Sequence, residues 1–128
     1  MYKITAGIGK HGVEARVFPT KEGIILHLLG GEKPHIGAVV ISIPRKSLSG
    51  DGSISCTTST LPFVGHKDDV ALKPITEKLA ILTEQRVVGI SGIHVKDASK
   101  EDISILLNNV NVLTGQILDH FGPKNENT

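Results

Sequence analysis

The segment 57–69 carries the densest set of side chains that could bind a ligand. Hydroxyl residues at 57–60 and a Gly-His-Lys sequence at 65–67 lead into an amphipathic helix pattern. The first N–H groups of a helix have no partner within it and carry the positive end of its dipole, so such a junction favours anions, and Lys67 adds a point charge suited to phosphate. The expected anion site comprises Thr58, Ser59, Gly65, His66 and Lys67. A polar loop followed by an Asp68 cap explains the same pattern without a ligand.

A second candidate is the sequence His35-Ile36-Gly37, at the start of a long apolar run. Gly37 would let a planar ligand approach the backbone, and His35 could donate a hydrogen bond to it. A mostly apolar cleft with few polar anchors is typical of cofactor binding and needs no catalytic groups. A glycine in a twisted strand and a histidine on a surface loop would give the same sequence pattern without any ligand, so both interpretations stay open.

Other chemistries have weaker support. Imidazole and carboxylate groups suit Zn, Mn or Fe, but their spacing here matches no established ligand motif. The residues of this metal alternative are His35, His66, Asp68 and Asp69. Ser59 lacks the G-x-S-x-G elbow of a hydrolase, and the glycine spacing of a Walker loop is absent. The single cysteine, Cys56, lies in an alternating apolar stretch that favours an inert buried thiol.

Alternation with period two predicts an antiparallel meander of about five strands. The expected strands are residues 2–8, 13–17, 24–29, 36–43 and 53–57. The runs 24–29 and 36–43 are almost continuously apolar, which is typical of central strands covered on both faces.

The period then changes to that of helices. A stripe over residues 72–82 predicts an amphipathic helix that starts close to Pro74, and residues 87–95 predict a sixth strand. Ser99 and Asp102 resemble a capping box that opens a second helix, with a core stripe at Ile103, Leu106, Val110, Leu113 and Ile117. The predicted fold is α+β: a meander followed by helix–strand–helix in one domain, 1–122, with a disordered tail, 123–128.

Strand direction locates the candidate residues. Because neighbouring strands of a meander alternate in direction, the segments 9–12, 30–35, 57–67 and 94–97 should meet at one edge of the sheet. This edge would hold His11, His35, His66 and His94, and residues 44–46 would lie at the opposite edge.

The second predicted helix carries more apolar residues than one buried stripe requires. The additional residues are Ile105, Leu107, Val112 and Leu118. So wide a band indicates a second buried surface, and a homodimer interface is the simplest expectation. Burial of the helix on two sides within one chain would have the same pattern.

Composition argues against several classes of partner. Fourteen basic and 13 acidic residues leave a net charge of +1, and only four aromatic residues are present, so a nucleic-acid interface is not expected. The N-terminus leads directly into a strand pattern, and no apolar run approaches the ~20 residues of a membrane span. A cytoplasmic protein is expected.

Three motifs carry a family resemblance: GAVVISIPR at 37–45, TLPFVGHKDD at 60–69 and GIHVKDASKEDI at 92–103. The pattern resembles the prenylated-flavin chaperone family, small proteins associated with UbiD-type gallate or hydroxybenzoate decarboxylases. The similarity extends over about residues 4–113. This family resembles proteasome assembly chaperones in fold, which agrees with an α+β domain that forms dimers.

The resemblance implies a binding protein without enzymatic activity. It would bind reduced prenylated FMN, protect it from oxidation and deliver it to a UbiD-type decarboxylase. Motif and topology coincide at His35, Gly37, His66 and Lys67, which are the expected ligand contacts. Two alternatives stay open: a small metal-dependent enzyme or accessory decarboxylase component, and an assembly chaperone that binds no ligand.

Overall fold

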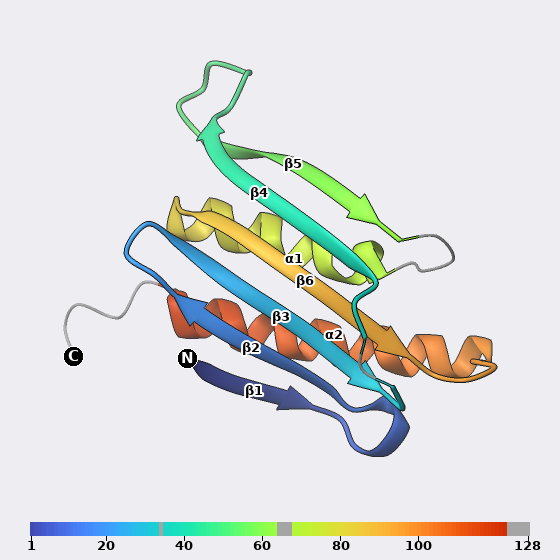
Figure 1. Ribbon diagram of the computed structural model, residues 1–128. Helices are drawn as coiled ribbons and strands as arrows, with labels where there is room; N and C mark the ends of the chain where they lie inside the picture. The colour runs from blue at the N-terminus through green and yellow to red at the C-terminus, as the bar shows by residue number, and fades with distance from the viewer. Residues whose placement is uncertain (34, 64–67, 123–128) are drawn as a thin grey trace.

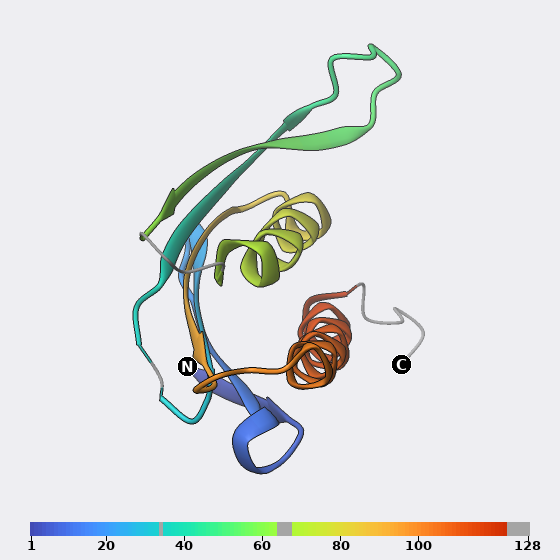
Figure 2. The ribbon, with the colours of Figure 1, turned by 90° about the vertical axis from the view of Figure 1, so that its right-hand side faces the viewer.

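Six strands form one sheet, and two helices lie on one of its faces (Figures 1 and 2). The computed structural model describes residues 1–33, 35–63 and 68–122. The strands are β1 Tyr2–Ala6, β2 Val13–Pro19, β3 Gly23–Gly31, β4 Ala38–Lys46, β5 Ile54–Pro62 and β6 Arg86–His94. The helices are α1 Asp68–Thr83 and α2 Lys100–Phe121, with a 3-10 turn, η1, at Gly9–His11. The predicted α+β class is confirmed as a single domain, and the predicted tail at 123–128 lies outside the described residues.

The strand order is β1-β2-β3-β6-β4-β5, which differs from a simple meander. β3 and β6 are parallel, and the other neighbouring pairs are antiparallel. The expected hairpin between β3 and β4 is therefore wrong, because β6 inserts between them. β6 has no charged residue between Arg86 and His94, so the centre of the sheet, where both of its edges are paired, suits it best.

Two element boundaries also differ from the prediction. β5 continues to Pro62 instead of ending near 57, because Thr58 and Thr60 are β-branched and pair with the long strand β4. α1 begins at Asp68, six residues before Pro74, so the proline lies inside the helix rather than at its start. The carbonyl left unpaired by this proline belongs to Val70, whose side chain is exposed, so water can reach this side of the helix.

The core lies between the inner face of the sheet and the two helices. Its fully buried large side chains include Val17, Leu26, Leu28, Val40 and Val87 of the sheet and Leu72, Ile75, Leu79, Leu113 and Ile117 of the helices. α1 approaches β6 closely at Gly89, where a Cβ would lie 2.9 Å from atoms of both Leu72 and Thr76. The predicted stripes are largely confirmed, although Leu82 and Ile103 at their ends are exposed. Neither described helix has the length and hydropathy needed to span a bilayer.

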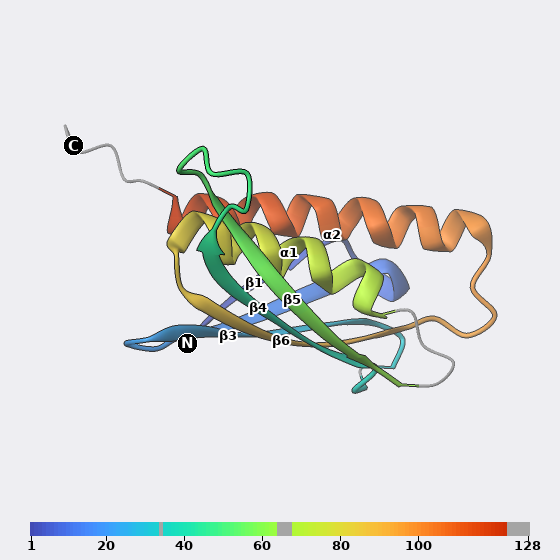
Figure 3. The same cartoon turned by 90° about the horizontal axis from the view of Figure 1, so that it is seen from above.

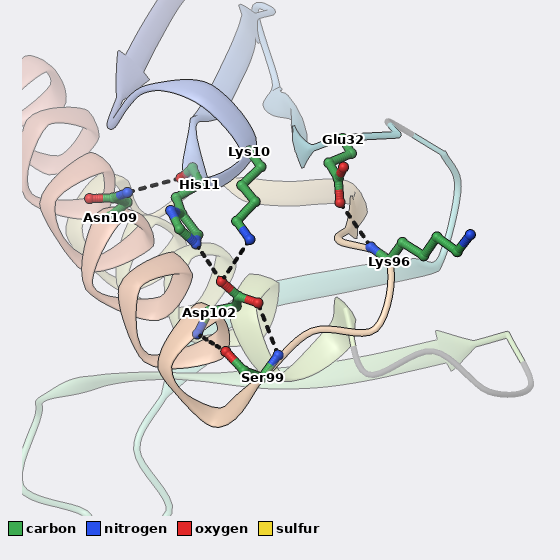
Figure 4. Close-up of polar contacts among 7 residues, drawn as sticks. All are labelled: Lys10, His11, Glu32, Lys96, Ser99, Asp102 and Asn109. Carbon is green, nitrogen blue, oxygen red and sulfur yellow. Dashed lines mark hydrogen bonds and ion pairs between the residues drawn. The ribbon is translucent and has the colours of Figure 1, made fainter.

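The predicted capping box at the start of α2 is confirmed. The Ser99 hydroxyl accepts a hydrogen bond from the Asp102 N–H, and the Asp102 carboxylate accepts one from the Ser99 N–H (Figure 4). The same carboxylate lies 2.8 Å from His11 Nε2 and 3.3 Å from Lys10 Nζ, both in η1. Asn109, two turns later, donates to the His11 carbonyl. These contacts fasten the β1–β2 connection to α2.

Asp102→Asn is expected to lower the melting temperature by several degrees at neutral pH. The Ser99 N–H, and then His11, hold the pKa of the Asp102 carboxyl well below its ordinary value of 3.8. Since the folded-state pKa is depressed, this stabilisation is present above pH ~4 and is lost as the pH falls toward the folded-state pKa. The difference between wild type and Asp102→Asn in thermal melts should therefore shrink below pH ~4. Glu101→Gln, in the same helical turn, is the matched control, and an equal loss there would contradict the assignment.

Candidate functional site

The ends of three strands and the starts of both helices meet at one edge of the sheet (Figures 1 and 3). Gly31 at the end of β3 pairs with His94 at the end of β6, and Pro62 at the end of β5 pairs with Ala38 at the start of β4. The predicted gathering of 9–12, the described part of 30–35, and 94–97 is confirmed. The direction argument holds despite the inserted β6, because β3 and β4 still run in opposite directions.

His35 and Asp68 form the central polar pair at this edge. His35 Nε2 lies 3.3 Å from Asp68 Oδ2, and the Asp68 side chain is only 6% exposed. Asp68 Oδ1 also accepts a 2.8 Å hydrogen bond from the Ile93 N–H of β6. The pairing of β6 with β4 ends at Ser91, two residues earlier, so the carboxylate takes the place of a strand partner there. Asp68 therefore joins α1, β6 and the chain that precedes β4.

Two glycines allow the β3–β4 connection to pass close to β6 and to Asp68. A Cβ on Gly92 would overlap the backbone carbonyl of His35, so the β3–β4 connection lies directly on β6 at that point. A Cβ on Gly37 would overlap the Asp68 carboxylate and lie 3.0 Å from His35 Nε2. The space over Gly37 is therefore filled by protein side chains. This differs from the expectation that Gly37 opens the backbone to a planar ligand.

An apolar cavity of about 350 Å³ opens beside the Asp68 carboxylate, between α1, the end of β6 and the first half of α2. Apart from Asp68 and His94, its walls are hydrocarbon. The lining residues are Asp68, Ala71, Ile93, His94, Val95, Ala98, Ile103, Leu106, Leu107 and Val110. The rings of His94 and His35 are 6.0 Å apart in an edge-to-face arrangement. The volume lies at the lower end of the usual range for small-molecule pockets.

Two of the residues predicted for the anion site lie away from this edge. Thr58 and Ser59 are inside β5, four and three residues before its end, so their assignment to a loop is wrong. Thr58 Oγ1 donates a 2.6 Å hydrogen bond to Glu77 of α1 and lies 3.0 Å from Ser42 Oγ, while Ser59 is exposed on the other face. Thr58 thus fastens α1 to the sheet. The other three predicted residues, Gly65, His66 and Lys67, lie outside the described residues.

The described parts of the chain contain no cluster of metal ligands, and two carboxylates lie at the positive end of the α1 dipole. Within residues 1–33, 35–63 and 68–122, no three His, Cys, Asp or Glu side chains are arranged to hold a metal ion. The first turn of α1 contains Asp68 and Asp69, whose charges oppose the positive end of the dipole. Cys56, expected to be buried, is half-buried, with Sγ 3.8 Å from Thr58 Oγ1.

Sequence reasoning missed the cavity wall supplied by α2. The pattern predicts a core position for Ile103 and a dimer surface for Leu107, yet both residues line the cavity. The wide apolar band on this helix was the available signal in the sequence. The band is wide because its residues form part of the core and also line the cavity. The buried role of Asp68 was also missed, because a carboxylate that begins a helix reads as a cap.

The sequence of the chain matches a known protein family. No curated protein matches the chain in a sequence search. A family model, described as the prenylated flavin chaperone LpdD-like domain, matches residues 7–122, which cover both helices and all strands except β1. The chain therefore belongs to the family of prenylated flavin chaperone LpdD-like domains.

Proposed function

We propose that this protein binds reduced prenylated FMN without transforming it, protects it from oxidation and delivers it to a UbiD-type decarboxylase. The observation that supports this most directly is the cavity of about 350 Å³ beside Asp68. It lies at the edge where the loops and helix starts meet, and membership of the flavin chaperone family supports the choice of ligand.

The residues of the cavity fit the chemistry of a prenylated flavin. The aliphatic side chains of Ile93, Leu106 and Val110 suit the hydrocarbon ring that prenylation adds. The Asp68 carboxylate suits the N–H groups of a reduced flavin as a hydrogen-bond acceptor, and His35 beside it can hold the carboxylate in position. Packing of a reduced flavin against apolar walls excludes water and slows its contact with dissolved oxidants.

We assign the ribityl phosphate to the sequence Gly65-His66-Lys67, which directly precedes Asp68 in the chain. In this proposal Lys67 supplies a point charge for the phosphate and His66 a hydrogen bond. The carboxylates of Asp68 and Asp69 disfavour a phosphate held by the helix dipole alone, so the contribution of Lys67 is essential to this part of the proposal.

Ala98→Phe tests the cavity. Ala98 is exposed at the cavity wall, so a phenyl ring there would occupy the mouth without entering the core. Affinity for reduced prenylated FMN, titrated anaerobically, is expected to fall at least about tenfold, equivalent to ~1.4 kcal/mol. The melting temperature should stay near that of wild type, because the substitution is on the surface.

The matched control is Leu82→Phe, which enlarges a side chain in the separate groove between the C-terminal halves of α1 and α2. It should retain wild-type affinity. Unchanged binding in Ala98→Phe would refute the cavity as the site.

Lys67→Ala tests the phosphate contact independently. The affinity for reduced prenylated FMN is expected to fall about tenfold to a hundredfold, because a charge-assisted bond is lost. Turnover of an aromatic acid by the isolated protein, abolished by EDTA, would favour the metal-dependent enzyme instead.

A further inference from the structure

The sheet face opposite the helices has an apolar centre. Figure 2 shows both helices on the concave side of the sheet and no helix over the other side, which we call the outer face. On the outer face the β3–β4 connection crosses the end of β6 at Gly92. Side chains alternate between the two faces, and those of the central strands are mostly hydrocarbon on both. The outer-face apolar residues are Ile25, Leu29, Val39, Ile41, Ile43, Leu61, Val88 and Ile90.

These side chains form one continuous patch. Val88 pairs across the strands with both Ile25 of β3 and Ile41 of β4. In the next outward-facing row, Val39 pairs with both Ile90 of β6 and Leu61 of β5. The exposed fractions of Ile25, Ile43 and Leu61 are 44%, 46% and 63% in the isolated chain. Near-continuous apolar strands predict cover on both faces. Among the described residues, the helices cover the inner face, and the outer face is covered only where the β3–β4 connection crosses β6 at Gly92.

Polar residues border the patch on both sides. Lys3, Glu14 and Arg16 form ion pairs on the outer face of β1 and β2. On the other side, Arg45 donates to Thr57. An apolar centre with a polar rim is the usual anatomy of a protein–protein interface. His27, opposite Arg16 in the register, lies within the patch. Burial, and then Arg16, lower the pKa of His27 below the ordinary 6.5, which favours its neutral form.

The outer face has the area that a stable dimer needs. β3, β4, β5 and β6 each contain nine residues. With ~3.3 Å per residue and ~4.8 Å between strands, they cover about 600 Å² in projection, and their side chains expose more. A standard-size interface buries about 800 Å² per partner. We propose that a second copy of this chain packs on the outer face, so that two sheets stack inside two outer helical layers.

A second copy fits this surface better than a transient partner does. Interfaces between permanently associated protomers are more apolar than transient ones, and the centre of this patch contains no charged side chain. Stacked sheets related by a two-fold axis are a stable arrangement in which each copy covers the other. The α2 surface expected from the sequence is less available, because Leu107 lines the cavity and Leu118 packs against the core.

Ile41→Glu is the direct test. Ile41 lies at the centre of the outer face, paired with Val88 on one side and Ser59 on the other, so a carboxylate there would be buried between the sheets without a partner. Light scattering across a concentration series is expected to show a wild-type dimer and at least a hundredfold weaker association of the variant. Circular dichroism checks that the variant is folded. Val112→Glu, on the exposed side of α2, should leave the dimer intact.

A second variant keeps the test decisive if Ile41→Glu does not fold. The chain has no tryptophan, so Ile43→Trp places a single tryptophan on the outer face, and its fluorescence can be excited selectively. Acrylamide quenching of this tryptophan should decrease as the protein is concentrated into the dimer range. The proposal is overturned by a wild-type chain that stays monomeric at high micromolar concentration. It is also overturned by a dimer that Val112→Glu dissociates, or by one whose formation leaves the quenching unchanged.

Discussion

Asp68→Ala is expected to lower the free energy of unfolding by about 3 kcal/mol, because it removes a buried carboxylate that holds three parts of the chain together. The Ile93 N–H would lose its 2.8 Å acceptor, and His35 Nε2 would lose the oxygen 3.3 Å away. Hydrogen bonds to charged groups are stronger than neutral ones, and the buried partners left behind add their own desolvation cost. Chemical denaturation monitored by circular dichroism measures the change.

The size of the loss separates two roles for this residue. Loss of a helix cap alone costs about 1 kcal/mol, which is the expectation from the sequence. A measured loss near that value would contradict the bridging role. Asp68→Asn should lose less than Asp68→Ala, because the amide oxygen can still accept from the Ile93 N–H. Asp69→Ala, the neighbouring carboxylate in the same turn, should cost no more than about 0.5 kcal/mol through the helix dipole.

Local patterns predicted most of the elements because their causes are local. Alternation and near-continuous apolar runs together identified all six strands, and the capping box at Ser99 and Asp102 located the start of α2. The order of strands was not predictable in this way. The position of β6 between β3 and β4 depends on which apolar strand best fills the centre, and that comparison involves the whole sheet.

The candidate site was predicted in outline and not in detail. Strand direction alone placed His35 and His94 at one edge, since it needs only the alternation of successive elements. The contact between His35 and Asp68 joins residues 33 positions apart, and no spacing rule reports it. Thr58 and Ser59 were misplaced because a run of hydroxyl residues is as compatible with a strand as with a loop. The cavity forms only where α1 and α2 meet, so neither helix pattern revealed it.

Among glycine-to-alanine substitutions at the described residues, Gly92→Ala is expected to have the largest effect. The added Cβ would overlap the His35 carbonyl carbon and oxygen, which are backbone atoms and cannot turn aside as a side chain can. Either the β3–β4 connection lifts from β6 or β6 shifts in the sheet, and both separate His35 from Asp68. We expect a loss of about 3 kcal/mol or more of unfolding free energy, comparable with severe overpacking.

Gly115→Ala makes the same chemical change where nothing opposes it. Gly115 lies in α2, is exposed, and has no atom within 4 Å of the position that a Cβ would take. Because alanine is the better helix former and restricts the unfolded chain, this variant should gain about 0.5–1 kcal/mol. The opposite signs of the two substitutions, measured in the same denaturant titration, attribute the loss at Gly92 to the crossing chain rather than to glycine replacement in general. A Gly92→Ala protein as stable as wild type would show that His35 does not lie on β6, and with it the pairing of His35 with Asp68 would lose its structural basis.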